Sequence, residues 1–172
     1  MERLFVLAGK ARSGKDSIAS IIEKYYEGKK VVKYPCTLYL KRYVSQIYGW
    51  DGGEEDKPRE TLQKLGHDIK EKYPDFFINR MREDINFLQG NADVIIITGV
   101  RLQKELDFLK NEYNGILMKV EKSDFDNGLT IHEKNDITEV DVDNYNNYDY
   151  VIQNDSDLKS LEDETIKILR EV

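Results

Sequence analysis

Two unbroken apolar runs are the clearest pattern in the chain. Residues 3–8 run Arg-Leu-Phe-Val-Leu-Ala, and residues 93–98 run Asp-Val-Ile-Ile-Ile-Thr, rich in β-branched side chains. Continuous apolar runs of this length indicate strands that are buried on both faces. Shorter runs at 30–34, 115–120 and 150–152 predict three further strands.

Between these runs, apolar residues recur every three or four positions, which is the spacing of one buried helix face. The helix expected to start at Lys15, for example, carries Ile18, Ile21, Ile22 and Tyr25 on one stripe. The same spacing predicts helices over 38–49, 62–69, 78–88 and 102–109 and a last helix after Ser156, which we expect to be its N-cap. The stretch 51–58 is a loop by composition, and 121–147 is polar, poorly periodic and expected to lie outside the core.

Strands that alternate with helices predict an α/β fold, a five-stranded, mostly parallel sheet with helices on both faces, formed by one domain over 1–172. In such sheets ligands bind at the carboxyl ends of the strands. Gly9, Gly99 and the stretch 119–122 all fall at predicted strand ends.

Composition narrows the classes of function. No apolar run approaches the roughly 20 residues that a membrane span needs. We therefore expect a cytoplasmic protein that has no membrane partner. The net charge of −7 argues against a partner that is a nucleic acid polymer, but a local cluster of Lys and Arg can still bind a small phosphorylated ligand. Cys36 is the single cysteine, and His67 and His132 are too few for a zinc centre, so neither an internal disulfide nor a zinc site is expected.

The segment that follows the first strand has the spacing of a phosphate-binding loop (P-loop). It consists of Gly9, Lys10, Ala11, Arg12, Ser13, Gly14, Lys15, Asp16 and Ser17. Glycines five positions apart allow close approach of the backbone, so that successive N–H groups and the N-terminus of the next helix can point at phosphate oxygens. Lys15 is expected to reach the β- and γ-phosphates of ATP and to be catalytic, because it stabilises charge that shifts during transfer.

Asp16 stands where this loop ordinarily has Ser or Thr, and Ser17 follows one residue later. A hard cation prefers oxygen ligands, so we expect Asp16, with Ser17, to take part in holding Mg²⁺. Asp16 is therefore a second predicted catalytic residue.

The sequence of the loop, Gly-x-x-Arg-Ser-Gly-Lys-Asp-Ser, resembles that of the phage-type deoxynucleoside monophosphate kinases and is similar to that of animal-type phosphomevalonate kinases. The resemblance continues in order along the chain. It is carried by Tyr34-Pro35-Cys36, Leu40-Lys41, Arg59-x-x-Leu62-Gln63-x-Leu65-Gly66, Val100-Arg101 with Glu105, Asp136-Ile137-Thr138-Glu139 and residues 149–155.

This resemblance implies a nucleoside monophosphate kinase-like fold of the P-loop NTPase class and transfer of the ATP γ-phosphoryl group to a phosphorylated acceptor. It implies that residues 36–90, approximately, bind the acceptor and that 121–147 is lid-like. Arginine binds phosphate bidentately, so Arg59 and Arg101 are predicted to bind the acceptor, with Gln63 and Lys41 beside them, and Arg101 is also a predicted catalytic residue. The expected partners are ATP and a small phosphorylated acceptor, and the expected assembly is a monomer or a homodimer.

Two positions depart from the family pattern. The family has Asp where Gly99 ends the strand at 93–98, so an acidic function there is missing or moved. The lid-like segment contains no arginine, which leaves Lys119, Lys122 and Lys134, or else Arg12 and Arg101, as the cations for transfer. These departures keep two alternatives open: a kinase of the same fold for another acceptor, such as dephospho-coenzyme A or phosphomevalonate, and an ATP-binding regulatory module that transfers no phosphate.

Overall fold

The computed structural model describes residues 1–53, 56–123, 126 and 128–172. Glu54 and Glu55 of the predicted loop, and three residues of the lid-like segment, 124, 125 and 127, lie outside the described residues, as does the side chain of His132. Within the described part, five parallel strands form one sheet in the order β2-β3-β1-β4-β5. The strands are β1 (Arg3–Ala8), β2 (Val31–Pro35), β3 (Val94–Val100), β4 (Ile116–Glu121) and β5 (Tyr150–Gln153).

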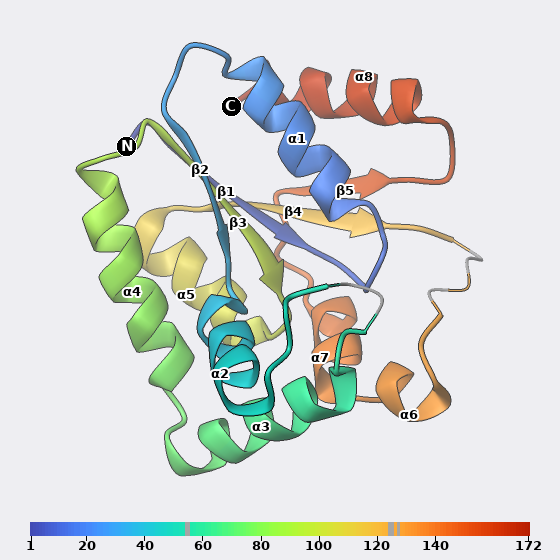
Figure 1. Cartoon of the computed structure of the whole chain (residues 1–172). Coiled ribbons are helices and arrows are strands. Elements are labelled where there is room, and N and C mark those ends of the chain that lie inside the picture. Colours follow the sequence, from blue (N-terminus) through green and yellow to red (C-terminus); the bar gives the residue numbers. More distant parts are fainter. Residues whose placement is uncertain (54–55, 124–125, 127) are drawn as a thin grey trace.

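The helices cover both faces of this sheet (Figure 1). They are α1 (Lys15–Tyr25), α2 (Leu38–Tyr48), α3 (Arg59–Lys72), α4 (Phe76–Gln89), α5 (Gln103–Tyr113), α6 (Ile131–Lys134), α7 (Ile137–Val140) and α8 (Leu158–Leu169), with a 3₁₀ turn η1 (Asp141–Asn144). Helices α1 and α8 lie on one face, α4 and α5 on the other, and α2, α3 and α7 gather beyond the carboxyl ends of the strands (Figure 1).

Alternation along the central strands builds the two cores. Leu4 and Val6 of β1 pack with α4 and α5, whereas Phe5 and Leu7 pack with α1 and α8. Four consecutive side chains of β3, residues 94–97, are fully buried. The unbroken apolar runs of the sequence thus reflect strands that need apolar contacts on both sides. A separate small cluster of Val44, Trp50 and Leu62 joins α2 to α3.

Two local expectations are wrong. The N-cap of α8 is Asp157, whose side chain accepts a hydrogen bond from the backbone N of Ser160 at 2.8 Å, and not Ser156. An N-cap side chain accepts from the N–H two or three residues after it, and Asp157, which immediately precedes Leu158, is placed to reach the N–H of Ser160. Tyr25, expected on the buried stripe of α1, is 41% exposed because it ends the helix.

The expectation that 121–147 lies outside the core is wrong for its second half. Val142 is fully buried, and Tyr145 is 7% exposed within the core on the α4–α5 face. Polar contacts hold this part down: Asp141 accepts from the backbone N of Gln103 at 2.7 Å, and Tyr145 donates to Asp107 at 2.9 Å. The hydrophobic pattern misses it because its anchors are polar and its apolar residues follow no single period.

Among the described residues, the structure has no helix with both the length and the apolar character that crossing a membrane demands.

Candidate phosphoryl-transfer site

The predicted P-loop lies between β1 and α1, so strand, loop and helix follow one another as the sequence predicts. Gly9 and Gly14 have φ of +137° and +106°, a region that favours glycine. A Cβ on Gly9 would collide with the carbonyl oxygen of Val120, and one on Gly14 with the side-chain amide of Asn154. That amide donates to the carbonyl oxygen of Ser13 at 2.8 Å, so the β5–α8 connection supports the loop from behind.

Lys15 is buried at the start of α1, where its ammonium donates to the carbonyl oxygen of Gly9 at 2.9 Å and lies 3.4 Å from Ser13 Oγ. Burial, with the positive charge of Arg101 as a second cause, lowers the pKa of Lys15 to about 7. Burial makes the charged form of this lysine costly, and the negative charge of a polyanion beside it would offset that cost.

The larger of two cavities beside the loop, which we call the main pocket, measures about 490 Å³ and opens between the P-loop, α2, α3 and the end of β3. It brings together most of the predicted residues: Ala11, Arg12, Lys15, Asp16, Lys41, Arg59, Gln63 and Arg101 all line it. Further lining residues were not singled out by the sequence: Pro35, Thr37, Leu40, Lys57, Leu62, Gly66, Lys70, Thr98, Thr138 and Glu139. Those from Thr37 to Lys70 lie in the predicted acceptor-binding region, and Thr138 and Glu139 lie in the lid-like segment. Of the described lining residues, seven are Lys or Arg, and two, Asp16 and Glu139, are acidic.

Some predicted site residues do not line the main pocket. Lys10 and Ser13 line a different cavity, and Gly9, Gly14 and Ser17 are not among the described residues that line either one. Ser17 lies in the first turn of α1, one residue beyond Asp16.

Helix α3 presents one face to the main pocket. Arg59, Gln63, Gly66 and Lys70 follow one another at helical spacing along it. Gly66 lets α3 approach α2 closely, since a Cβ there would lie 3.4 Å from the side chain of Leu40 on α2. Arg59 and Gln63 thus lie one turn apart on the same wall, as predicted.

Arg101 follows β3 at the floor of the main pocket. Glu105, from the first turn of α5, accepts hydrogen bonds from the backbone N of Arg101 at 3.0 Å and of Leu102 at 3.2 Å. This contact gives a physical reason for an Arg followed four residues later by Glu: the carboxylate fixes the turn that carries the guanidinium. Burial raises the pKa of Glu105, and the two backbone hydrogen bonds act in the opposite direction.

Gly99, the first departure from the family pattern, is a bulge. The register of β1 against β3 steps from Leu7–Thr98 to Ala8–Val100, and Gly99 between them has φ of +75°. The bulge explains both the glycine and the extension of β3 beyond residue 98, where the strand was expected to end. A carboxylate nevertheless enters the main pocket, from Glu139 on α7.

Glu139 is 6% exposed and joins three elements. Its Oε1 lies 2.6 Å from Nη1 of Arg101, and its Oε2 accepts a hydrogen bond from the backbone N of Ala11 at 3.1 Å. The segment 121–147 therefore contacts the P-loop through the carboxylate of Glu139.

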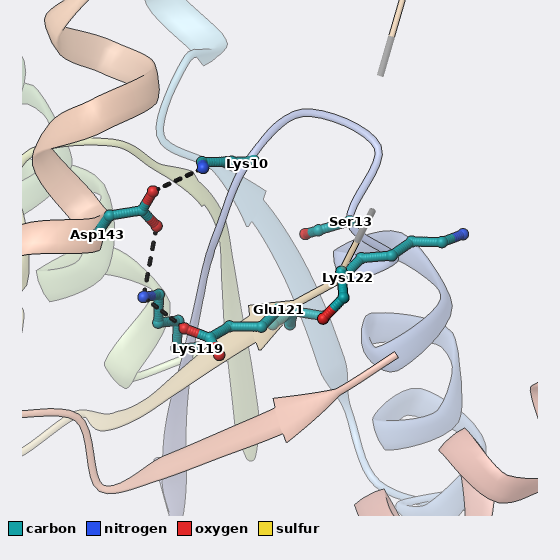
Figure 2. Close-up of a pocket in the computed structure, with 8 residues that line it drawn as sticks. Lys10, Ser13, Lys119, Glu121, Lys122 and Asp143 are labelled. Carbon is teal, nitrogen blue, oxygen red and sulfur yellow. Dashed lines mark ion pairs between the residues drawn. The ribbon is translucent and has the colours of Figure 1, made fainter. Parts of the chain in front are cut away.

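The second, smaller pocket lies on the other side of the loop and measures about 220 Å³. Asp143 of η1 contacts Lys10 at 2.8 Å and Lys119 at 3.4 Å, and Lys119 contacts Glu121 at 2.7 Å (Figure 2). This chain of ion pairs links the P-loop, η1 and β4. Lys122 points away from it (Figure 2).

Of the cations weighed for transfer, Arg12 and Arg101 line the main pocket, whereas Lys119 and Lys122 line the smaller one. Lys134 lies 3.3 Å from Asp126 on the surface. Arg12 has φ of +61°, and its guanidinium lies against Gly128 of the lid-like segment. The two arginines thus line the same pocket as Lys15, whereas Lys119, Lys122 and Lys134 are not among its described lining residues.

The residues present fit a bound Mg²⁺. Asp16 is exposed at the wall of the main pocket beside Lys15, and Mg²⁺ sites of kinases ordinarily combine one or two carboxylates with phosphate oxygens and waters. Among the described residues no group of three or more His, Cys, Asp or Glu is placed to hold a metal, so the ion would depend on phosphate oxygens for most of its ligands.

No protein-family model matches the chain, and no curated protein does. Two solved structures are similar over nearly their whole length. Shikimate kinase from Aquifex aeolicus VF5 has a TM-score of 0.52 at 16% identity and covers 98% of this chain and 96% of its own. A sugar kinase from Janibacter sp. HTCC2649, in unliganded form, has a TM-score of 0.50 at 12% identity and covers 99% and 95%.

These likenesses bear on the fold. Together with the five parallel strands and the helices on both faces, they confirm the predicted α/β P-loop fold of the nucleoside monophosphate kinase-like kind. Identities this low do not bear on the substrate. They also do not address the resemblance to phage-type deoxynucleoside monophosphate kinases or phosphomevalonate kinases, which stays a prediction.

Proposed function

We propose that the protein transfers the γ-phosphoryl group of ATP, with Mg²⁺, to a nucleoside or deoxynucleoside monophosphate, giving the diphosphate and ADP. The observation that carries this proposal is the lining of the main pocket. One wall is the P-loop, the opposite wall is α3, and the described lining holds seven cationic side chains against two carboxylates.

The charge of this lining favours an acceptor that already carries phosphate. A cation at a partly enclosed surface is desolvated at a cost, and a phosphate with which it forms charge-assisted hydrogen bonds offsets that cost. A neutral acceptor could form no such charge-pairing with the α3 wall. The shikimate kinase and sugar kinase with the same fold support phosphoryl transfer to a small molecule in general.

The residues then have the following roles in the proposal. Lys15 and the P-loop amides bind the ATP phosphates, and Lys15 with Arg101 stabilises the charge that moves to the bridging oxygen during transfer. Arg59 and Arg101 hold the acceptor phosphate, with Lys41 beside them, so that its oxygen faces the γ-phosphorus. Gln63, one turn from Arg59, contacts the base or sugar.

Mg²⁺ would be held by Asp16 together with phosphate oxygens, and it would supply compensation of the phosphate charge. Ser17 is the other predicted ligand; its place in the first turn of α1 suits contact with the α-phosphate. Both assignments belong to the proposal.

A coupled assay of ADP release tests it. The acceptors are the ribo- and deoxyribonucleoside monophosphates, dephospho-coenzyme A, phosphomevalonate, shikimate and a neutral sugar. We expect turnover with at least one nucleoside monophosphate, abolished in Lys15→Met and retained in Lys24→Met, which removes an exposed lysine on the same helix.

Turnover with dephospho-coenzyme A or phosphomevalonate alone would replace the acceptor and keep the reaction. ATP binding without turnover of any acceptor would instead identify a regulatory module.

A further inference from the structure

The carboxylate of Glu139 occupies donors that a phosphate would need. One of them, the backbone N of Ala11, belongs to the P-loop, and the other, Arg101, is a lining cation at the end of β3. Lys15 lies close enough for Glu139 to raise its pKa against the larger effects of burial and Arg101. A buried anion thus already lies among the groups that are arranged to bind anions.

This placement is held from several sides and does not depend on Glu139 alone. Before it, Asp136 caps α7 by accepting from the backbone N of Thr138 at 2.9 Å and lies 2.9 Å from Nε2 of His67 on α3. After it, Asp141 accepts from the backbone N of Gln103, and Asp143 pairs with Lys10 of the P-loop. The single turn of α7 is therefore anchored to α3, α5 and the P-loop, with the Glu139 side chain pointing into the main pocket.

A phosphate group bound to the Ala11 amide or to Arg101 would lie beside the Glu139 carboxylate. Two like charges this close, shielded from water, repel each other strongly. The carboxylate and a bound phosphate would therefore compete for the same two donors, the guanidinium of Arg101 and the amide of Ala11.

We propose that Glu139 is a positioning residue of the transfer site: its carboxylate holds Arg101 and the Ala11 amide in place and gives them up to a phosphate group that binds there. Its negative charge keeps the Arg101 guanidinium in place but lowers the affinity of the site for phosphate. The inference rests on the phosphate-binding part of the proposed function and needs no phosphoryl transfer.

Calorimetric titration with inorganic tripolyphosphate, at one pH and low ionic strength, tests the proposal. Glu139→Gln keeps the shape and an oxygen for the Ala11 amide but removes the charge. We expect the Kd for tripolyphosphate to fall at least about tenfold, which is about 1.4 kcal/mol. Glu171→Gln, an exposed residue at the C-terminus, removes the same charge and is expected to bind like the wild-type protein.

Glu139→Asp is the second variant, and it guards against misfolding of the first. It keeps the charge, but its shorter side chain cannot span both Arg101 and the P-loop, so we expect a Kd between those of the wild type and Glu139→Gln. A merely structural role predicts the opposite sign, weaker binding in both variants. Equal or weaker binding of tripolyphosphate in both variants would overturn the proposal.

The outcome is separable from that of the proposed function. Tighter tripolyphosphate binding by Glu139→Gln with no turnover of any acceptor would keep this inference and reject the kinase. Turnover with a nucleoside monophosphate, with no gain in affinity for tripolyphosphate in either variant, would keep the kinase and reject this inference.

Discussion

The carboxylate of Glu105 accepts a hydrogen bond from the backbone N of Arg101 at 3.0 Å and thereby fixes the turn between β3 and α5. The side chain that is proposed to bind phosphate therefore depends on a residue that lines neither pocket. The same carboxylate oxygen also accepts from Leu102, so two N–H groups rely on it.

Glu105→Ala is expected to destabilise the protein by about 1–3 kcal/mol per N–H group left buried and unpaired, and to lower kcat because Arg101 loses its orientation. Chemical denaturation and the ADP-release assay measure the two effects. Glu105→Gln still offers an oxygen and is expected to lose less of both. Lys104→Ala, the exposed neighbour, serves as the control. An unchanged kcat in Glu105→Ala would show that Arg101 does not need this turn.

Nucleotide affinity is expected to fall as the pH rises. The pKa of Lys15 is about 7, and the phosphates of bound ADP are expected to raise it, so binding should take up a proton above pH 7. The phosphates of ADP are already ionised above about pH 8, since their second pKa is near 6. Between pH 8 and 10 the Kd for ADP should therefore rise up to about tenfold per pH unit.

Lys15→Arg is the matched control for this effect, because an arginine stays charged throughout the range. Its Kd for ADP is expected to be nearly constant from pH 8 to 10. A constant Kd in the wild-type protein would mean that Lys15 is already charged in the empty loop.

Arg59→Ala is expected to raise the KM for the acceptor more than the KM for ATP, because Arg59 lies on the α3 wall of the main pocket. Loss of a charge-assisted hydrogen bond of about 1.5–3 kcal/mol corresponds to roughly 10- to 150-fold in the acceptor KM. Steady-state kinetics with both substrates varied measure the split. Lys64→Ala removes an exposed cation from the same helix and is expected to change neither KM. Equal effects of Arg59→Ala on both KM values would place Arg59 outside the acceptor site.

Asp136 is expected to stabilise the lid-like segment, since it caps α7 and contacts His67. Asp136→Ala should cost about 0.5–2 kcal/mol and lower Tm by about 2–4 °C per kcal/mol. Burial acts to raise the pKa of Asp136, but the hydrogen bonds from Thr138 and His67 outweigh it and lower the pKa. The stabilisation is therefore present above about pH 4, the ordinary value for Asp, and is lost as the pH falls through the lowered pKa.

Thermal melts of the wild type and Asp136→Ala from pH 7 down to pH 3 measure this loss. The two curves should approach each other only at the acid end. Asp163→Ala, an exposed carboxylate on α8, is the control. A difference in Tm that stays constant to pH 3 would contradict the role of the ionised carboxylate.

The sequence by itself determined the parts of the protein that obey a local rule. Buried strands must be apolar on both faces, which is why β1 and β3 were visible as unbroken runs. The P-loop was visible because Gly9 and Gly14 have backbone angles, and neighbours within contact distance, that other residues do not tolerate. Parallel strands place their ends at one edge, so even the approach of Arg101 to Lys15 followed from the fold class.

Only the tertiary structure decided which residues distant in the sequence complete the lining of the main pocket. Glu139 and Lys70 lie in the lid-like and acceptor-binding regions that the resemblance implies, but no local pattern singles out either residue. They line the main pocket because α7 and α3 pack beyond the strand ends (Figure 1). Gly99 stands where the family has Asp, and the structure shows that it forms a β-bulge. The carboxylate in the main pocket comes instead from Glu139, 40 residues further along the chain. Contacts of this kind depend on where polar anchors such as Asp136 and Asp141 hold a segment, and polar pairing across long sequence separations leaves no periodic trace in a single chain.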